Sequence, residues 1–88
     1  MEDIFKKLRE QLEQEDWPAV YLFKFIVPND AEKLAIITSL FNDSNDLVLH
    51  QSKNGNFVSV SVKELMLDVD SIIEKYTEAA KIKGVISL

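Results

Sequence analysis

Apolar and polar residues alternate along two long segments of the chain, as they do in strands that are buried on one face. Residues 20–28, VYLFKFIVP, are rich in aromatic and β-branched side chains and end at a proline, which predicts a strand. One side of this strand carries Tyr21, Phe23, Phe25 and Val27. Because the other side includes the charged Lys24, we expect the aromatic side to face the core.

The second alternating segment contains Asn54-Gly55, the strongest short-range signal for a two-residue β-hairpin turn. LVLHQSK precedes this pair and NFVSVSVKE follows it. A type I′ turn would place Lys53 opposite Asn56, and the same register would pair His50 with Ser59. In that register one face carries Leu47 and Leu49 together with Val58, Val60 and Val62. The turn residues and the apolar alternation of the flanking segments therefore both predict a hairpin.

An amphipathic helix is predicted near the start of the chain, over residues 2–14. Its apolar stripe is narrow and consists of Ile4, Phe5, Leu8 and Leu12. A helix with so narrow a stripe is stable only when it packs against another part of the protein. Trp17-Pro18 would end the segment.

Two further helices begin with capping-box spacing, in which a small polar residue precedes an acid by three positions. Asn29 and Glu32 give this signal for one helix, and Ser71 and Glu74 give it for the other. Gly84 fits the position just after the last helix. Residues 85–88, VISL, would then form a short closing strand.

The predicted order is a helix followed by β-α-β-β-α-β, which is the ferredoxin-like order. We therefore expect an α+β fold with an antiparallel sheet and both crossover helices on one face. The chain would divide into an N-terminal amphipathic helix, residues 1–16, and a ferredoxin-like domain, residues 17–88.

This arrangement leaves the second face of the sheet open. By the alternation of the strands, that face would carry Val20, Leu22, Lys24, Ile26, Val48, His50, Phe57, Ser59 and Ser61. It is too apolar to be left in water without a function. The N-terminal helix, a second subunit or a partner protein is expected to cover part of it.

Composition narrows the range of partners. The 88 residues suit one domain, and ten basic against fifteen acidic side chains give a net charge of −5. This charge disfavours nucleic acid and anionic membranes as partners. The chain has no cysteine, which excludes disulfides and thiolate sites. It shows no signal peptide and no run of the ~18 apolar residues that a membrane span needs, so we expect a cytoplasmic protein.

Candidate chemistry is sparse. KNGNFVSV resembles an RNA-recognition signature, but Phe57 is its only aromatic match. His50 is the only histidine, and no acid is placed to orient it. The residues at 42–46, NDSND, lack the frame of a calcium loop and predict a polar turn. The sequence therefore predicts a protein that is not an enzyme and that has no metal or cofactor site.

The run SKNGNFVSVSV, residues 52–62, is similar to the S-x-K-G-x-[YF]-x-S-[VI]-[ST]-V run of the YbeD-like family of small bacterial proteins. FKFIVPND, residues 23–30, and AAKIKGVISL, residues 79–88, add to the resemblance, which covers most of residues 17–88. The variant resembles those of Bacteroidetes-type bacteria. The resemblance implies a ferredoxin-like fold similar to that of ACT regulatory domains, which bind amino acids at dimer interfaces.

Two functions are consistent with these observations. The first is a regulatory or protein-interaction module that uses the open sheet face and the N-terminal helix to bind a partner protein or a second copy of itself. The second, implied by the ACT resemblance, is a small-ligand sensor at a dimer interface. In that case Asn29 and Asp30, in the first strand-to-helix loop, would meet the ammonium group of an amino acid. Helix capping is the structural alternative for these two residues.

Overall fold

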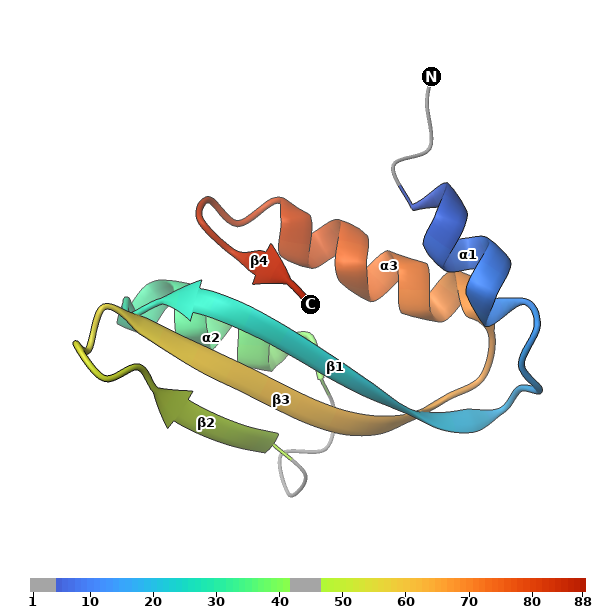
Figure 1. Cartoon of the computed structure of the whole chain (residues 1–88), viewed down its shortest axis with the longest axis horizontal. Helices are drawn as coiled ribbons and strands as arrows, with labels where there is room; N and C mark the ends of the chain where they lie inside the picture. Colours follow the sequence, from blue (N-terminus) through green and yellow to red (C-terminus); the bar gives the residue numbers. More distant parts are fainter. Residues whose placement is uncertain (1–4, 42–46) are drawn as a thin grey trace.

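The structure, a computed structural model, describes residues 5–41 and 47–88 (Figure 1). These residues form an α+β fold with a four-stranded antiparallel sheet and three helices. In chain order the elements are α1 (Lys6–Leu12), β1 (Ala19–Pro28), α2 (Ala31–Ser39), β2 (Leu47–Gln51), β3 (Phe57–Met66), α3 (Val69–Ala80) and β4 (Ile86–Ser87). The strand order is β2-β3-β1-β4, so β3 and β1 are the central strands.

Alternation along β1 decides which side of the sheet is buried. Phe23 and Phe25 are fully buried, whereas Leu22 is exposed. Successive side chains of a strand point to opposite faces. The sheet therefore has a core face, which carries Phe23 and Phe25, and an open face on the other side. Ile37 of α2 and Ile72 of α3 are fully buried in the same core, which confirms the predicted orientation of this strand.

Most of the aromatic side chains gather on the helix side of the sheet. Seven of the eight aromatic residues form one connected network of ring contacts: Phe5, Trp17, Tyr21, Phe23, Phe25, Phe41 and Tyr76. The hydroxyls of Tyr21 and Tyr76 lie 2.9 Å apart and share a hydrogen bond. Burial raises the pKa of Tyr76 above its ordinary value, and the hydrogen bond to Tyr21 acts in the same direction. Both hydroxyls are thus satisfied within the core.

The hairpin between β2 and β3 has the predicted register. His50 pairs with Ser59 and Leu49 pairs with Val60. One face then carries Leu47, Leu49, Val58, Val60 and Val62, as the pattern required. A shift of one residue would have moved all of them to the other face.

The hairpin turn differs from the prediction. A type I′ turn needs positive φ at both central residues, yet Gly55 has a φ of 77° and Asn54 has no positive φ. The Phe57 carbonyl instead accepts a hydrogen bond from the Ser52 N–H, which leaves a loop of four residues. The side-chain oxygen of Asn54 accepts hydrogen bonds from the Ser52 hydroxyl and the Asn56 N–H, and these stabilise the wider loop. The type I′ prediction was wrong for this reason.

The carboxylates of Asp30 and Asp68 cap α2 and α3. Asp30 accepts a hydrogen bond from the Glu32 N–H at 2.9 Å, so Asn29 is not the cap. Asp68 accepts one from the Ser71 N–H at 2.8 Å, which also holds the pKa of Asp68 below its ordinary value. In both places a carboxylate close to the predicted residue caps the helix equally well. Capping-box spacing alone did not distinguish the two.

The chain turns sharply between α3 and β4. The helix ends at Ala80 and its C-cap is Lys81, so Gly84 lies beyond the position predicted for it. Gly84 has a φ of 86°, and a Cβ added there would lie 2.9 Å from Cγ of Pro28. Glycine is therefore needed for the approach of this turn to the end of β1.

Helix α1 packs against α3. Leu12 is only 3% exposed and belongs to the common core, and the rings of Phe5 and Tyr76 lie 6.1 Å apart. An exposed ion pair joins Arg9 to Asp70 at 2.6 Å. The N-terminal helix was one of three expected covers for the open face. It packs against α3 instead and does not cover that face. Ile4, as well as the turn and metal ligands considered at residues 42–46, lies outside the described residues.

Candidate interaction surface

The strand register defines the residues of the open face. They are Val20, Leu22, Lys24 and Ile26 of β1, Val48 and His50 of β2, Phe57, Ser59, Ser61, Lys63 and Leu65 of β3, Ile86 of β4, and Leu88 just beyond it. Leu88 continues the pairing, because its N–H donates to the Lys24 carbonyl at 2.9 Å. All nine residues that the sequence placed on this face lie there.

An apolar band extends over β1, β4 and the two ends of β3 on this face. We define it as Val20, Leu22, Ile26, Phe57, Leu65, Ile86 and Leu88. Five members, all except Ile26 and Phe57, are more than half exposed. Side chains of this size are normally buried when they support the fold of their own chain. The band is therefore apolar surface that the described chain leaves uncovered.

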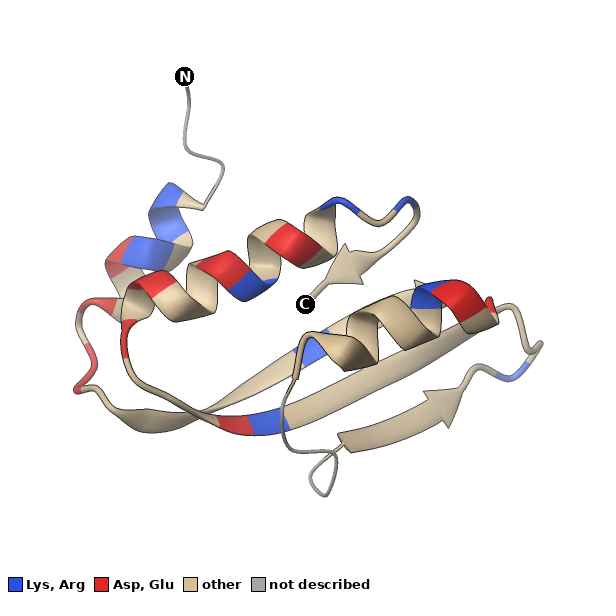
Figure 2. Cartoon of the chain, turned by 180° about the vertical axis from the view of Figure 1, so that it is seen from behind, with Lys and Arg blue, Asp and Glu red and all other residues tan. Residues whose placement is uncertain are grey.

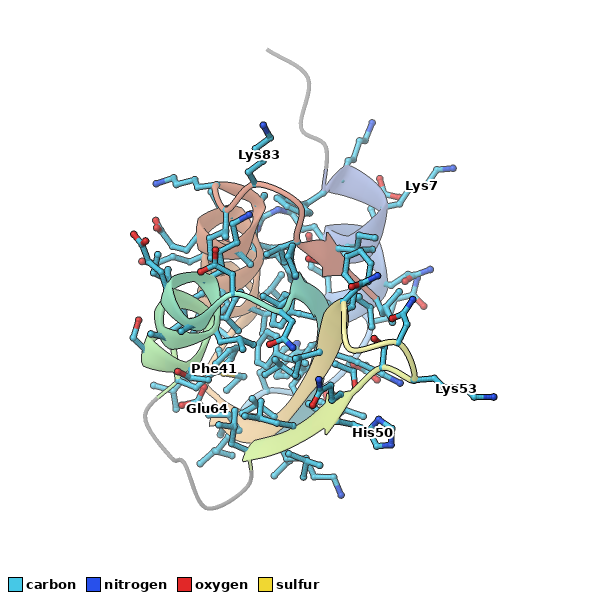
Figure 3. All side chains as sticks on the ribbon, turned by 90° about the vertical axis from the view of Figure 1, so that its left-hand side faces the viewer. Lys7, Phe41, His50, Lys53, Glu64 and Lys83 are labelled. Atoms are coloured by element: carbon cyan, nitrogen blue, oxygen red, sulfur yellow. The ribbon has the colours of Figure 1, made fainter. Side chains whose placement is uncertain are left out.

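Polar residues of the same face lie on β1, β2 and β3, and Lys24 of β1 lies between the band residues Leu22 and Ile26. Lys24 pairs with Ser61 and Leu22 pairs with Lys63, so the two lysines are diagonal neighbours on adjacent strands. His50 and Lys53 point away from α2 and α3 in the end-on view of Figure 3. In the same view Glu64 lies on the helix side of the sheet. The described side chains of the open face include these two lysines, Lys24 and Lys63, and no carboxylate.

His50 is not arranged for catalysis with the serine opposite it. The Ser59 hydroxyl donates to the backbone carbonyl of His50 at 3.3 Å, and not to the imidazole. The imidazole itself is exposed to solvent. This pair therefore has the geometry of an ordinary cross-strand contact.

The structure separates the candidate surface residues into two groups. Val20, Leu22, Ile26, His50 and Phe57 lie together on the open face, as predicted. Two helix candidates, Phe5 and Leu8, are partly buried against the core instead.

Other residues of the face were missed. Lys63 and Leu65 follow from extending the alternation along β3, so the sequence did contain their signal. Ile86 is opposite Ile26 only because of the register between β4 and β1. A two-residue strand carries too little pattern to predict that register.

The loop after β1 uses both of its candidate ligand residues for structure. The Asn29 side chain donates to the Gly55 carbonyl at 2.8 Å, and its backbone N–H donates to the Asn56 carbonyl. The Asp30 carboxylate is the cap of α2. The hydrogen bonds of this loop therefore tie α2 to the hairpin turn.

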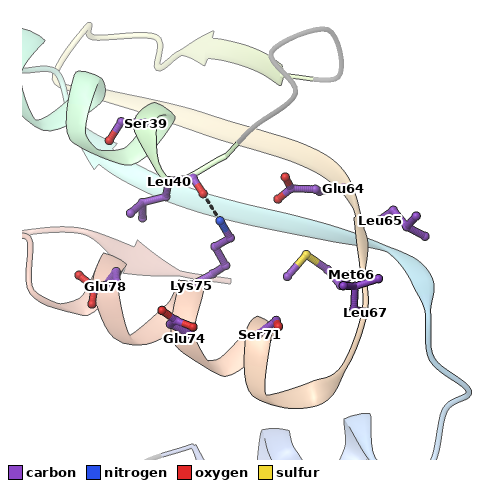
Figure 4. Close-up of a pocket in the computed structure, with 10 residues that line it drawn as sticks. All are labelled: Ser39, Leu40, Glu64, Leu65, Met66, Leu67, Ser71, Glu74, Lys75 and Glu78. Atoms are coloured by element: carbon purple, nitrogen blue, oxygen red, sulfur yellow. Dashed lines mark hydrogen bonds between the residues drawn. The ribbon is translucent and has the colours of Figure 1, made fainter.

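A groove of about 520 Å³, which the sequence did not predict, lies between α2, α3 and the far end of β3 (Figure 4). Its lining includes three carboxylates, Glu64, Glu74 and Glu78, and one amine, Lys75. The ammonium of Lys75 donates to the Leu40 carbonyl and lies 5.2 Å from the centre of the Phe41 ring. Lys75 is thus occupied in joining α3 to the end of α2, and the groove is mainly acidic.

Within residues 5–41 and 47–88, no helix is long and apolar enough to cross a membrane. The same residues contain no cluster of three or more His, Cys, Asp or Glu side chains that could hold a metal ion. No protein-family model, curated protein or solved structure matches the chain.

Proposed function

We propose that this protein is a non-enzymatic interaction module that binds a partner protein through the open face of its sheet. The apolar band carries this proposal, because its large side chains are exposed while those at the centre of the core face, such as Phe23, Phe25 and Val60, are fully buried. A contiguous exposed apolar patch on a folded chain is typical of a protein-binding site. The lysines and serines beside it would form the polar rim that such sites have.

The arrangement of the strands supports a ferredoxin-like fold for this module. From β1 to β4 the elements follow the order β-α-β-β-α-β, and β1 lies between β3 and β4. The run that resembles the YbeD-like family, residues 52–62, forms the hairpin loop and the start of β3. Membership of that family is part of the proposal.

Helix α1 contributes to this function by completing the core. Its apolar residues Phe5, Leu8 and Leu12 pack toward α3 and the aromatic network. They are therefore not available to a partner while the helix is docked. The open face alone is the binding surface in this proposal.

Replacing Leu22 by Asp is expected to abolish partner binding without unfolding the protein. Leu22 is 53% exposed in the middle of the band, so a charge there faces water in the free protein but is buried in the complex. Leu49→Asp is the matched control, since Leu49 is 51% exposed on the core-face side of β2. The measurement is affinity capture from extracts of the source cells with immobilised wild-type and variant chains.

We expect a protein that is retained by the wild type and by Leu49→Asp and lost with Leu22→Asp. Thermal melting of all three chains checks that they are folded. Equal retention by the Leu22 and Leu49 variants would show that the band is not the binding surface.

The amino-acid sensor is the alternative function. Asn29 and Asp30 already make hydrogen bonds within the chain, so a ligand would have to add to these contacts or replace them. A thermal-shift screen of amino acids separates the two functions. A ligand at 100 times its Kd adds about 2.7 kcal/mol to stability. We expect no shift, and a clear shift with one amino acid would favour the sensor.

A further inference from the structure

We infer that the partner presents an amphipathic helix with an acidic flank, which lies lengthwise along the apolar band. This inference rests on the proposed function and adds the chemistry of the partner. Three observations support it: the charges on the open face, the length of the band, and the presence of helices on only one side of the sheet.

The charge of the open face is opposite to that of the whole chain. The net charge is −5, yet Lys24 and Lys63 are the charged residues that the strand register places on this face. Most acidic positions, coloured red in Figure 2, lie instead on the helices and in loops. Neither lysine forms an ion pair with another described residue. Two neighbouring ammonium groups with no carboxylate side chain on the same face favour a partner that supplies one.

The same charges argue against a second copy of the chain as the occupant. Stacking two open faces would bring Lys24 and Lys63 of both copies into one interface. No acidic residue of either open face is available there to offset them. Like charges brought together in an interface suppress that pairing. A partner with carboxylates therefore fits better than self-association through this face.

The shape of the band suits a helix. From Val20 to Ile26, with Lys24 between Leu22 and Ile26, the open face extends over six steps of β1, which is about 20 Å at ~3.3 Å for each residue. A helix of about 13 residues has the same length. The core face of this sheet is already covered by α2 and α3. A helix on the open face would complete a layered arrangement with helices on both sides of one sheet.

The arrangement of the face also orients such a helix. Its apolar stripe would contact Val20, Leu22 and Ile86 on the β1 and β4 side. The flank toward β3 would then lie over Lys24 and Lys63, so the carboxylates are expected on that flank.

A displayed library of random 16-residue peptides tests the inference. The library is selected on the immobilised wild-type chain, and the binding of the enriched peptides is then compared between the wild type and Leu22→Asp. We expect the enriched peptides to be acidic, with apolar residues at helical i, i+3 and i+4 spacing, and to become helical on binding. Enrichment of neutral or basic peptides, or of alternating strand-like ones, would overturn the inference.

Charge reversal provides the second measurement, on one enriched peptide. The double variant Lys24→Glu/Lys63→Glu is expected to bind this peptide at least about tenfold more weakly than the wild type does. A second peptide, in which lysines replace the acidic residues, is expected to regain affinity for the double variant. Lys7→Glu, at an exposed position of α1 (Figure 3), is the control and should bind normally. Unchanged binding by the double variant would overturn the inference.

The inference and the proposed function fail in different ways. A dimer in light scattering that Leu22→Asp dissociates would identify a second copy as the occupant. That result overturns the acidic helix but leaves the open face as the binding surface. If the enriched peptides instead bind Leu22→Asp as well as they bind the wild type, the face is not the surface and both fail.

Discussion

Phe23→Ala is expected to lower the free energy of unfolding by about 3–5 kcal/mol, as truncations of buried aromatic residues do. Phe23 is fully buried on β1. Its ring centre lies 4.8 Å from that of Tyr21, 5.1 Å from that of Phe41 and 5.5 Å from that of Tyr76. The substitution removes the ring that links β1 both to Phe41, just after α2, and to Tyr76 of α3.

The size of this loss matters because the domain is small. At ~0.05–0.15 kcal/mol for each residue, a chain of 88 residues has a stability of about 4–13 kcal/mol. Urea unfolding followed by circular dichroism measures the change. Phe57→Ala is the control, because Phe57 is 41% exposed on the open face. An equal loss with both variants would contradict the assignment of core and open faces.

Leu12→Ala is expected to lower the free energy of unfolding by about 2–5 kcal/mol, which is the usual cost of removing a buried leucine. Leu12 is 3% exposed and belongs to the same core as the sheet, although it lies in the N-terminal helix. The Trp17 indole N–H donates to its carbonyl at 2.8 Å, which fixes the end of the helix against the start of β1. The effect would show that α1 is part of the fold.

Leu22→Ala provides the contrast. It removes the same atoms from the open face, where they contact mainly water, so the expected change is within about 0.5 kcal/mol. Both variants are compared by urea unfolding. If Leu12→Ala were neutral and Leu22→Ala costly, the roles assigned to the helix and to the open face would be reversed.

The parts of the fold that were predicted correctly are those where two independent signals agree. In the hairpin, the turn position and the apolar alternation both require Leu49 opposite Val60, and the structure has this pair. In β1, the aromatic residues and the single lysine assign the same face to the core. The open-face residues of β1 and β3 follow from this alternation alone.

The parts that were not predicted depend on contacts distant in sequence. The apolar stripe of α1 shows which side of the helix is buried, but not that it packs on α3. Asp30 caps α2 instead of Asn29 because the helix begins at Ala31, one residue later than the spacing signal indicates. The acidic groove forms only where α2, α3 and β3 meet, so no local sequence pattern predicts it. Local sequence therefore predicts which face of a helix or strand is buried better than it predicts which element packs against that face.

Site-specific cross-linking tests most directly whether the open face binds a partner. The photoreactive residue benzoylphenylalanine is placed at position 22 in one chain and at position 49 in another, and each is irradiated in extracts of the source cells. These positions are equally exposed and lie on opposite faces of the sheet. We expect a discrete heavier adduct from position 22 and none from position 49. The same adducts from both positions, or none from position 22, would contradict this expectation.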